Sequence, residues 1–141
     1  GGPAVAPTAT VASAGELAYD EAARRATYTT QAHVIGSQGD LTARVIELYL
    51  TGEGAGLERV EGYEAVSLRE AGRTTTGHRL SYVAREERYD VHGTPVRIVD
   101  GCRESTGRTL TFYKSADRIV VDGNEQKRTE TKLIPCPPST R

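Results

Sequence analysis

The sequence contains very few of the large apolar residues that build a compact core. Among its 141 residues there is no Trp, no Met and a single Phe, and hydrophobic residues make up 37%. A chain of this length is long enough for one domain with its own core. The scarcity of bulky apolar side chains argues against a closed globule, and it favours a flattened or elongated β structure with much exposed surface.

Neither sign of charge dominates, and no long apolar run is present. Eighteen basic and 19 acidic residues leave a formal net charge of −1. This balance gives no strong field that would favour nucleic acid or a membrane surface through counterion release. No run approaches the roughly 18 apolar residues of a membrane-spanning helix. Because the sequence has neither an initiator Met nor a signal peptide, we interpret it as a mature or excised domain.

Motifs for catalysis and metal binding are absent as well. The histidines His33, His78 and His92 do not have the spacing of a helical zinc motif, and no serine lies in a G-x-S-x-G elbow. The glycine-rich segment 52–56 lacks the Lys-Ser/Thr ending of a phosphate-binding loop. We therefore expect no enzymatic activity, no metal and no cofactor. Nucleic-acid binding is not expected either, because basic residues do not cluster around the aromatic ones.

Only two cysteines occur, Cys102 and Cys136, and they are 34 residues apart. Their separation is close to one period of the repeat described next, and equivalent positions in successive units would be about 4.5–5.5 Å apart at Cβ. This is near the spacing that a disulfide requires. We expect a Cys102–Cys136 disulfide that ties the C-terminal tail to the preceding unit, with two unpaired thiols as the alternative. A disulfide would indicate an oxidising compartment, periplasmic or extracellular.

A regular repeat is the strongest feature that the sequence does contain. A leucine followed two residues later by an aromatic residue or a second leucine recurs in steps of 31, 32 and 30 residues. Its four copies begin at Leu17, Leu48, Leu80 and Leu110. A Val-x-Gly signature follows at residues 60–62, 91–93 and 121–123. Self-similarity at such a period indicates stacked units, each a pair of strands with polar and glycine turns. Function is then expected from a continuous surface or groove.

Period-two alternation of apolar and polar residues predicts strands along most of the chain. The expected strands are approximately 15–20, 27–35, 41–51, 57–61, 63–70, 74–83, 87–92, 95–100, 106–114, 118–122 and 126–134. Residues 21–25 are predicted to form a tight turn, because this helix-like stretch is too short to be stable alone. Residues 41–50 interrupt the alternation, which predicts a strand with a bulge or one buried on both faces; a helix is the alternative.

The domain organisation follows from composition. Residues 1–13 are rich in Pro, Ala and Thr and are interpreted as a flexible linker. Residues 14–134 are predicted to form a single β domain, and residues 135–141 a C-terminal tail.

The order of these motifs resembles that of the OstA-like repeat family. The matching motifs are Gly77-x-x-Leu80-x-Tyr82, Tyr89-x-Val91-x-Gly93-x-x-Val96-x-Ile98, Gly107-x-x-Leu110-x-Phe112 and Ile119-x-Val121-x-Gly123. The family alternates "G/A-x-x-L-x-Y" and "V-x-G-x-V" strands, and it includes the LptA-type periplasmic bridge protein of lipopolysaccharide transport. The resemblance covers about residues 15–134. The early "I-x-A-D" signature of the family is missing, and residues 15–20 are only similar to it; the two cysteines are not general features of the family.

The resemblance implies an all-β, twisted β-jellyroll of stacked antiparallel strand pairs, with a hydrophobic interior groove and open end strands. It implies a periplasmic protein, without enzymatic activity, that shields lipid A acyl chains during lipopolysaccharide transport. Its partners would be lipopolysaccharide and the jellyroll domains of inner- and outer-membrane transport components, joined by edge-strand addition. Head-to-tail homo-oligomers are a further implied assembly. The chain would be a free bridge protein or a domain of a larger membrane-anchored component.

The repeated inward-facing apolar positions are the candidate lipid-binding groove. They are Leu48, Leu50, Val66, Leu68, Leu80, Tyr82, Val91, Val96, Ile98, Leu110, Phe112, Ile119 and Val121. A groove of this kind would take an alkyl chain, since burial of each methylene is worth about 0.8 kcal/mol. The alternative is that these residues simply pack as a closed core. Two other functions stay open: a β-solenoid scaffold that polymerises without ligand, and a glycan-binding or glycan-modifying solenoid enzyme.

Overall fold

In the residues that the structure describes, the regular secondary structure consists of β-strands. The computed structural model describes residues 10–36, 39–52, 56–70, 72–114, 116, 118–123 and 128–133. The strands are β1 (Val11–Ser13), β2 (Glu16–Asp20), β3 (Arg25–Gly36), β4 (Gly39–Leu50), β5 (Leu57–Glu70), β6 (Arg73–Val83), β7 (Arg88–Asp100), β8 (Arg103–Tyr113), β9 (Arg118–Asp122) and β10 (Glu130–Leu133). The described ranges hold no helix long and apolar enough to cross a membrane. The all-β prediction is confirmed.

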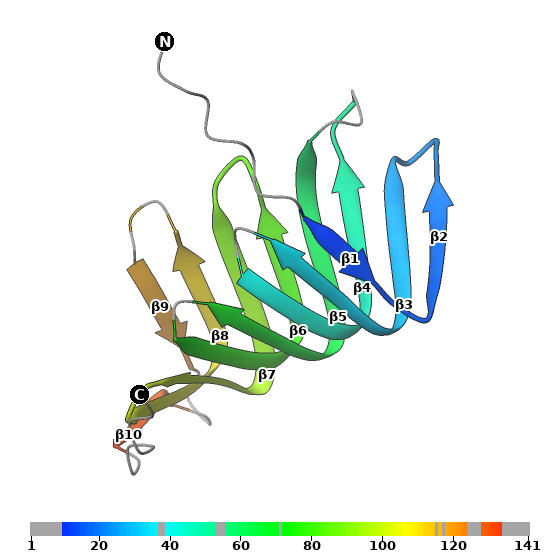
Figure 1. Ribbon diagram of the computed structural model, residues 1–141. Coiled ribbons are helices and arrows are strands. Elements are labelled where there is room, and N and C mark those ends of the chain that lie inside the picture. Colours follow the sequence, from blue (N-terminus) through cyan, green and yellow to red (C-terminus); the bar gives the residue numbers. More distant parts are fainter. Residues whose placement is uncertain are drawn as a thin grey trace, which may run out of the picture.

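The strands of the described residues form one antiparallel sheet (Figure 1). Strands β3 to β8 pair in sequence order, so each consecutive pair is a hairpin. Two short strands pair with each end of this run: β1 and β2 with opposite halves of β3, and β9 and β10 with opposite halves of β8. The sheet therefore does not close on itself, and each end exposes two edge strands.

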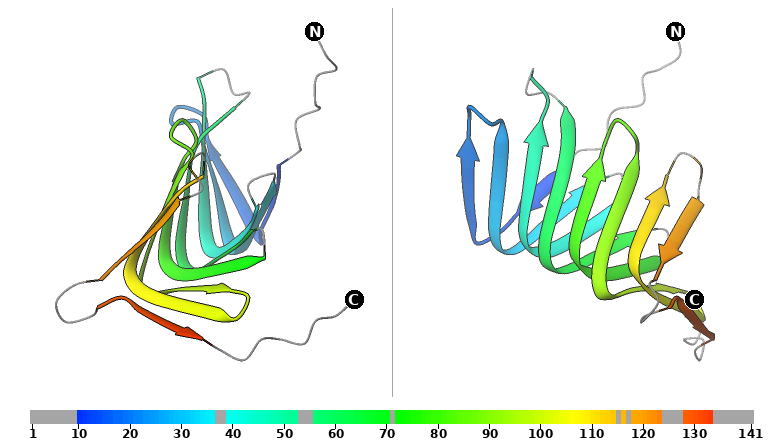
Figure 2. Two further views of the ribbon diagram at one scale, coloured as in Figure 1. Left: turned by 90° about the vertical axis from the view of Figure 1, so that its left-hand side faces the viewer. Right: turned by 180° about the vertical axis from the view of Figure 1, so that it is seen from behind.

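The long strands bend near their middle, which folds the sheet into a V (Figure 2). The pairing register shifts at the bend between all neighbouring long strands from β3 to β8, and the extra residues lie on every second strand, as a β-bulge produces. These bulges lie between Thr29 and Ala32 of β3, Tyr63 and Val66 of β5, and His92 and Val96 of β7. Thr30, Gln31, Glu64 and Ala65 have φ angles of 70°, 51°, 62° and 52°, in the left-handed region. We call the two parts of the V the β2/β9 half and the β1/β10 half, after the edge strands that each contains.

Small residues occupy the bend on the intervening strands. Ala43, Gly77 and Gly107 take equivalent positions on β4, β6 and β8, opposite the bulged strands. A Cβ atom at Gly77 would lie 2.7 Å from the carbonyl oxygen of His92, and one at Gly107 would lie 2.7 Å from that of Asp122. At Gly77 and Gly107 the neighbouring backbones approach too closely for a side chain, so glycine is what permits the bend on β6 and β8.

Side chains that point into the V form the core. In the β2/β9 half, two rows of paired residues run across all the strands. One row is Leu17, Tyr28, Ile46, Gly62, Leu80, Val91, Leu110 and Val121; the other is Tyr19, Ala26, Leu48, Val60, Tyr82, Tyr89, Phe112 and Ile119. The β1/β10 half contributes Val34, Leu41, Leu68 and Ile98, all buried. The repeat in the sequence therefore corresponds to one hairpin of the sheet and places equivalent residues side by side.

The structure corrects some element boundaries. Residues 57–70 and 88–100 each form one bent strand where the alternation predicted two, because Gly62 and Gly93 lie within strands rather than in turns. Residues 11–13, assigned to the flexible linker, form β1 and pair with β3. The predicted turn is confirmed at residues 21–24.

The ambiguous segment 41–50 lies in β4, so the predicted strand is confirmed and the helix is excluded. The predicted bulge is not in this segment, because the register shift after Thr42 comes from extra residues on β5. Residues 1–9 and the predicted tail, residues 135–141, lie outside the described residues, and the domain boundaries remain a prediction.

Candidate functional site: the interior of the bent sheet

The predicted groove residues come together inside the V. All of them except Leu50 belong to the apolar cluster there, although Ile119 and Val121 are only half-buried. Leu50 is half-buried at the end of β4. The structure thus gathers the repeated positions on one surface, as the alternation indicated.

Sequence reasoning missed part of this surface. The missed buried residues are Ala26, Ala32, Val34, Leu41, Ala43, Ile46, Val60 and Tyr89. Val60 and Tyr89 carried a usable signal, because Val60 begins a Val-x-Gly motif and Tyr89 lies two residues before Val91, on the same face of its strand. The alanines carried no such signal, because a small side chain does not mark a strand position as apolar among polar neighbours.

The interior is almost filled by its own side chains. Tyr82, Tyr89 and Phe112 form a line of rings, with centroid distances of 4.4 Å and 6.2 Å between successive members. A cavity of about 50 Å³ lies beside them; its lining includes Leu41, Leu57, Leu68, Leu80, Tyr82 and Tyr89. The cavity has room for only a few water molecules, each of which needs about 10–15 Å³ of such space. An alkyl chain could therefore enter only if the two halves of the V moved apart.

The β1/β10 half becomes polar towards its C-terminal end. Its interior row runs through Ala12, Val34, Leu41, Leu68, Thr75, Ile98, Ser105 and Thr131. At the far end of the row the hydroxyls of Ser105 and Thr131 hydrogen-bond at 2.9 Å. The interior is therefore most apolar between β3 and β7, where the cavity lies.

Charged side chains lie at the mouth of the V, where β5 ends and β6 begins. Glu70 and Arg73 form an ion pair at 3.4 Å, and their side chains are only 10% and 15% exposed. The Arg73 guanidinium carbon lies 4.7 Å from the ring centre of Phe112, which belongs to the opposite half. Burial raises the pKa of Glu70, although Arg73 and Lys114 act in the opposite direction. The contact between Arg73 and Phe112 joins the two halves across the mouth of the V.

Among the residues that the structure describes, no further strand covers either end of the sheet. At the N-terminal end Leu17 is 58% exposed and Tyr19 is 53% exposed, although both continue the interior rows. At the other end Ile119 and Val121 of β9 continue the same rows. Edge strands of this kind present backbone N–H and C=O groups that can pair with a strand of another chain. An added strand at the N-terminal end would also cover the exposed apolar side chains.

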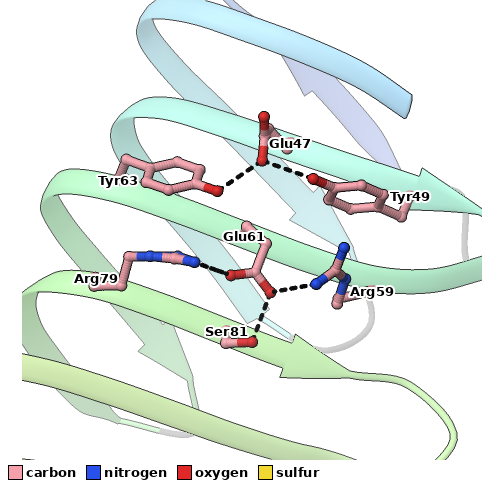
Figure 3. Close-up of polar contacts among 7 residues, drawn as sticks. All are labelled: Glu47, Tyr49, Arg59, Glu61, Tyr63, Arg79 and Ser81. Carbon is pink, nitrogen blue, oxygen red and sulfur yellow. Dashed lines mark hydrogen bonds and ion pairs between the residues drawn. The ribbon is translucent and has the colours of Figure 1, made fainter. Parts of the chain in front are cut away.

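A polar network covers the outer face of the β2/β9 half (Figure 3). Glu61 of β5 is only 3% exposed although it points away from the core. Its carboxylate accepts hydrogen bonds from Arg79 at 2.7 Å and Ser81 at 2.6 Å, and Arg59 lies 3.8 Å away. The buried charge of Glu61 is thus compensated by partners on its own strand and on the next.

Tyrosine rings extend the same network. Tyr63 and Tyr49 donate hydrogen bonds to Glu47 at 2.8 Å and 3.0 Å. The guanidinium of Arg79 lies over the Tyr63 ring at 4.2 Å, and that of Arg59 over the Tyr49 ring at 4.0 Å. Burial and the hydrogen bond to Glu47 raise the pKa of Tyr63 to about 12. These contacts stiffen the outer side of the wall whose inner side is apolar.

The substitution Glu61→Gln is expected to lower the free energy of unfolding by about 2 kcal/mol, measured by chemical denaturation. Breaking a buried ion pair costs about 3–5 kcal/mol. Arg79 is 39% exposed, so water screens part of this loss.

Glu64→Gln is the matched control for that substitution. Glu64 pairs with Arg44 at 3.3 Å, but both side chains are more than 60% exposed. Such a pair contributes at most about 1 kcal/mol. Equal losses in the two variants would contradict the role assigned to Glu61.

The histidines and cysteines form no common site in the described part of the chain. His33 contacts Asp40, and the His78 ring lies 3.0 Å from the Thr94 hydroxyl. No group of three or more His, Cys, Asp or Glu side chains within the described ranges is placed to hold a metal ion. Cys102 lies in the β7–β8 turn. Cys136 lies outside the described residues, so the Cys102–Cys136 bridge remains a prediction.

A solved structure shares this architecture. The fold is similar to that in the crystal structure of LptH from Pseudomonas aeruginosa, which is described as the LptA-homologous periplasmic component of the lipopolysaccharide transport device. The TM-score is 0.78, the sequence identity is 12%, and the match covers 90% of this chain and 96% of that chain. At this identity the likeness shows the fold, and the predicted β-jellyroll is confirmed. Neither a protein-family model nor a curated protein matches the sequence.

Proposed function

We propose that the chain is a periplasmic component of lipopolysaccharide transport that holds the acyl chains of lipid A between the two halves of the V. The observation that carries the proposal is the apolar interior, which runs across every strand of the β2/β9 half and reaches both open ends. The fold shared with LptH, a periplasmic component of that transport device, supports the choice of ligand. The protein binds and passes on its ligand without enzymatic activity and without a cofactor.

Ligand entry separates the two halves of the V. The cavity of about 50 Å³ is too small for an acyl chain, so the chain takes the place of side chains that now pack against the opposite half. Transfer of about ten methylenes from water gains roughly 8 kcal/mol. This gain offsets the packing energy that the two halves give up when they separate, and the bends leave the hydrogen-bonded ladders within each half intact.

Edge-strand addition joins the domain to its neighbours. Leu17 and Tyr19 are exposed at the N-terminal end, while Ile119 and Val121 end the same rows at the other. Pairing the N-terminal edge of one jellyroll with the C-terminal edge of another would align the rows into a longer groove. The partners are the jellyroll domains of inner- and outer-membrane transport components, and copies of this chain can stack head to tail in the same way.

Photocrosslinking in the periplasm of Gram-negative cells tests the proposed function. A photoreactive amino acid at Leu80 or Phe112 is expected to capture lipopolysaccharide. Val83 is the matched control, because it lies on β6 next to Tyr82 but on the outer face, and it should capture none. Adducts with protein alone at Leu80 and Phe112 would support the scaffold that polymerises without ligand, and would overturn lipid binding.

A further inference from the structure

The ion pair at the mouth of the V is not explained by an apolar groove. On β5 the interior face carries Val66 and Leu68, and Glu70 continues that alternation. On β6, Arg73 precedes the buried Thr75 in the same way. The side chains of Glu70 and Arg73 are almost as well buried as their apolar neighbours. Burying two charges costs free energy that their mutual attraction offsets only in part, so a closed core would be better served by apolar residues.

Arg73 retains unused hydrogen-bonding capacity. One Nη atom lies 3.4 Å from a Glu70 oxygen, and the guanidinium rests on the Phe112 ring. Its Nε is buried and has no hydrogen-bond partner within the described ranges. A guanidinium presents five N–H donors in one plane, an arrangement that matches the oxygens of a phosphate or carboxylate. Arg73 can therefore hold an anion more completely than it holds Glu70.

This pair lies next to residues that line the cavity. Tyr89 lines the cavity and stacks on Phe112 at a centroid distance of 6.2 Å. Gly39 also lines it, and a Cβ atom at Gly39 would lie 3.3 Å from the Cβ of Glu70. Electrostatic interactions link Glu70 to Tyr89 and Lys114 to Glu70. An alkyl chain in the cavity would consequently bring its polar end to Arg73.

We propose that Arg73, assisted by the positive charge of Lys114, binds the anionic headgroup of an amphiphile whose alkyl chain lies in the V. Glu70 pairs with Arg73 in this structure and is displaced when the headgroup arrives. The inference rests on the proposed function and adds to it the headgroup chemistry and its position at the mouth. Displacement of Glu70 also releases the Arg73–Phe112 contact, so headgroup binding and opening of the two halves occur together.

Isothermal titration calorimetry with two detergents of the same alkyl chain tests this inference. Dodecyl phosphate carries the anionic headgroup, and dodecyl maltoside a neutral one. Arg73→Gln is expected to weaken dodecyl phosphate binding by about tenfold relative to dodecyl maltoside binding, the loss of a charged hydrogen bond. Arg69→Gln is the matched control, because Arg69 is exposed on the outer face of β5. It should change neither affinity.

Two further variants keep the test independent of folding defects. Arg73→Lys retains the charge and should retain most of the preference for phosphate. Glu70→Gln removes the competing anion and should tighten dodecyl phosphate binding. If neither detergent binds the wild-type protein, the proposed function fails together with the inference. If both bind but Arg73→Gln weakens them equally, or Glu70→Gln leaves phosphate binding unchanged, only the headgroup site is wrong.

Discussion

The substitution Gly77→Ala is expected to lower the free energy of unfolding by about 2–3 kcal/mol, the cost of overpacking a well-packed site. The added Cβ would lie 2.7 Å from the carbonyl oxygen of His92 and 2.8 Å from a methyl of Val91. The carbonyl belongs to the backbone of β7, so it cannot turn away as a flexible side chain would. Either β6 and β7 move apart at the bend or the bend itself opens.

Gly62→Ala is the matched control, because Gly62 also lies within a strand and faces the core. The nearest atoms to a Cβ there, in Val66, Ala43 and Leu80, are 3.6–3.7 Å away, which is ordinary contact. Alanine should leave stability unchanged or raise it by about 0.5 kcal/mol, because it restricts the unfolded chain. Chemical denaturation of both variants measures the difference. A Gly77→Ala protein as stable as Gly62→Ala would mean that glycine is not required at the bend.

The repeat made the architecture predictable from sequence. Leu80 and Tyr82 precede Leu110 and Phe112 by one hairpin, and alternation alone puts both pairs on one face. Alternation and spacing are local properties, so they can be recognised in the sequence without knowledge of the rest of the fold. The stacking of hairpins and the identity of most interior residues followed from them.

The bends could not be predicted in the same way. The sequence pattern indicates turns at Gly62 and Gly93, yet both lie within long strands. A glycine allows a reversal of the chain, a bulge or a close approach of backbones, and its neighbours in sequence do not distinguish these. The bulge of β5 is made by Glu64 and Ala65, which carry no bulge signal. The alternation of apolar and polar residues before and after Gly62 is the same for a turn at Gly62 as for a continuous strand.

Buried charge was also beyond the reach of sequence reasoning. In the sequence, Glu70 and Arg73 are ordinary polar residues beside a turn, and Glu61 is an acidic residue on the solvent-facing side of a strand. Arg73 is covered because the bend brings Phe112, far away in the sequence, to within 4.7 Å. Glu61 is covered by side chains from its own and the next strand, Arg59 and Arg79 among them. Burial of this kind depends on the tertiary fold, so the proposed headgroup site became visible only in the structure.

Leu80→Ala is expected to lower the free energy of unfolding of the empty protein by about 3–4 kcal/mol, near the middle of the range for leucine truncation in cores. Leu80 is fully buried, and its partners across the sheet are Gly62 and Val91. Gly62 has no side chain that could move into the space, so the void persists. It merges with the cavity that Leu80 already lines.

A void next to the groove can take up an alkyl chain, whereas a void in an ordinary core cannot. Dodecyl maltoside should fill it, and the detergent should raise the melting temperature of Leu80→Ala more than that of the wild type. Leu133→Ala is the control, because Leu133 is 86% exposed and its truncation should change neither value. If Leu80→Ala lost stability and gained nothing from the alkyl chain, Leu80 would be core alone and the ligand would have to lie elsewhere. A larger gain with ligand would instead show that core and groove are one surface, which opens when an alkyl chain replaces the protein's own side chains.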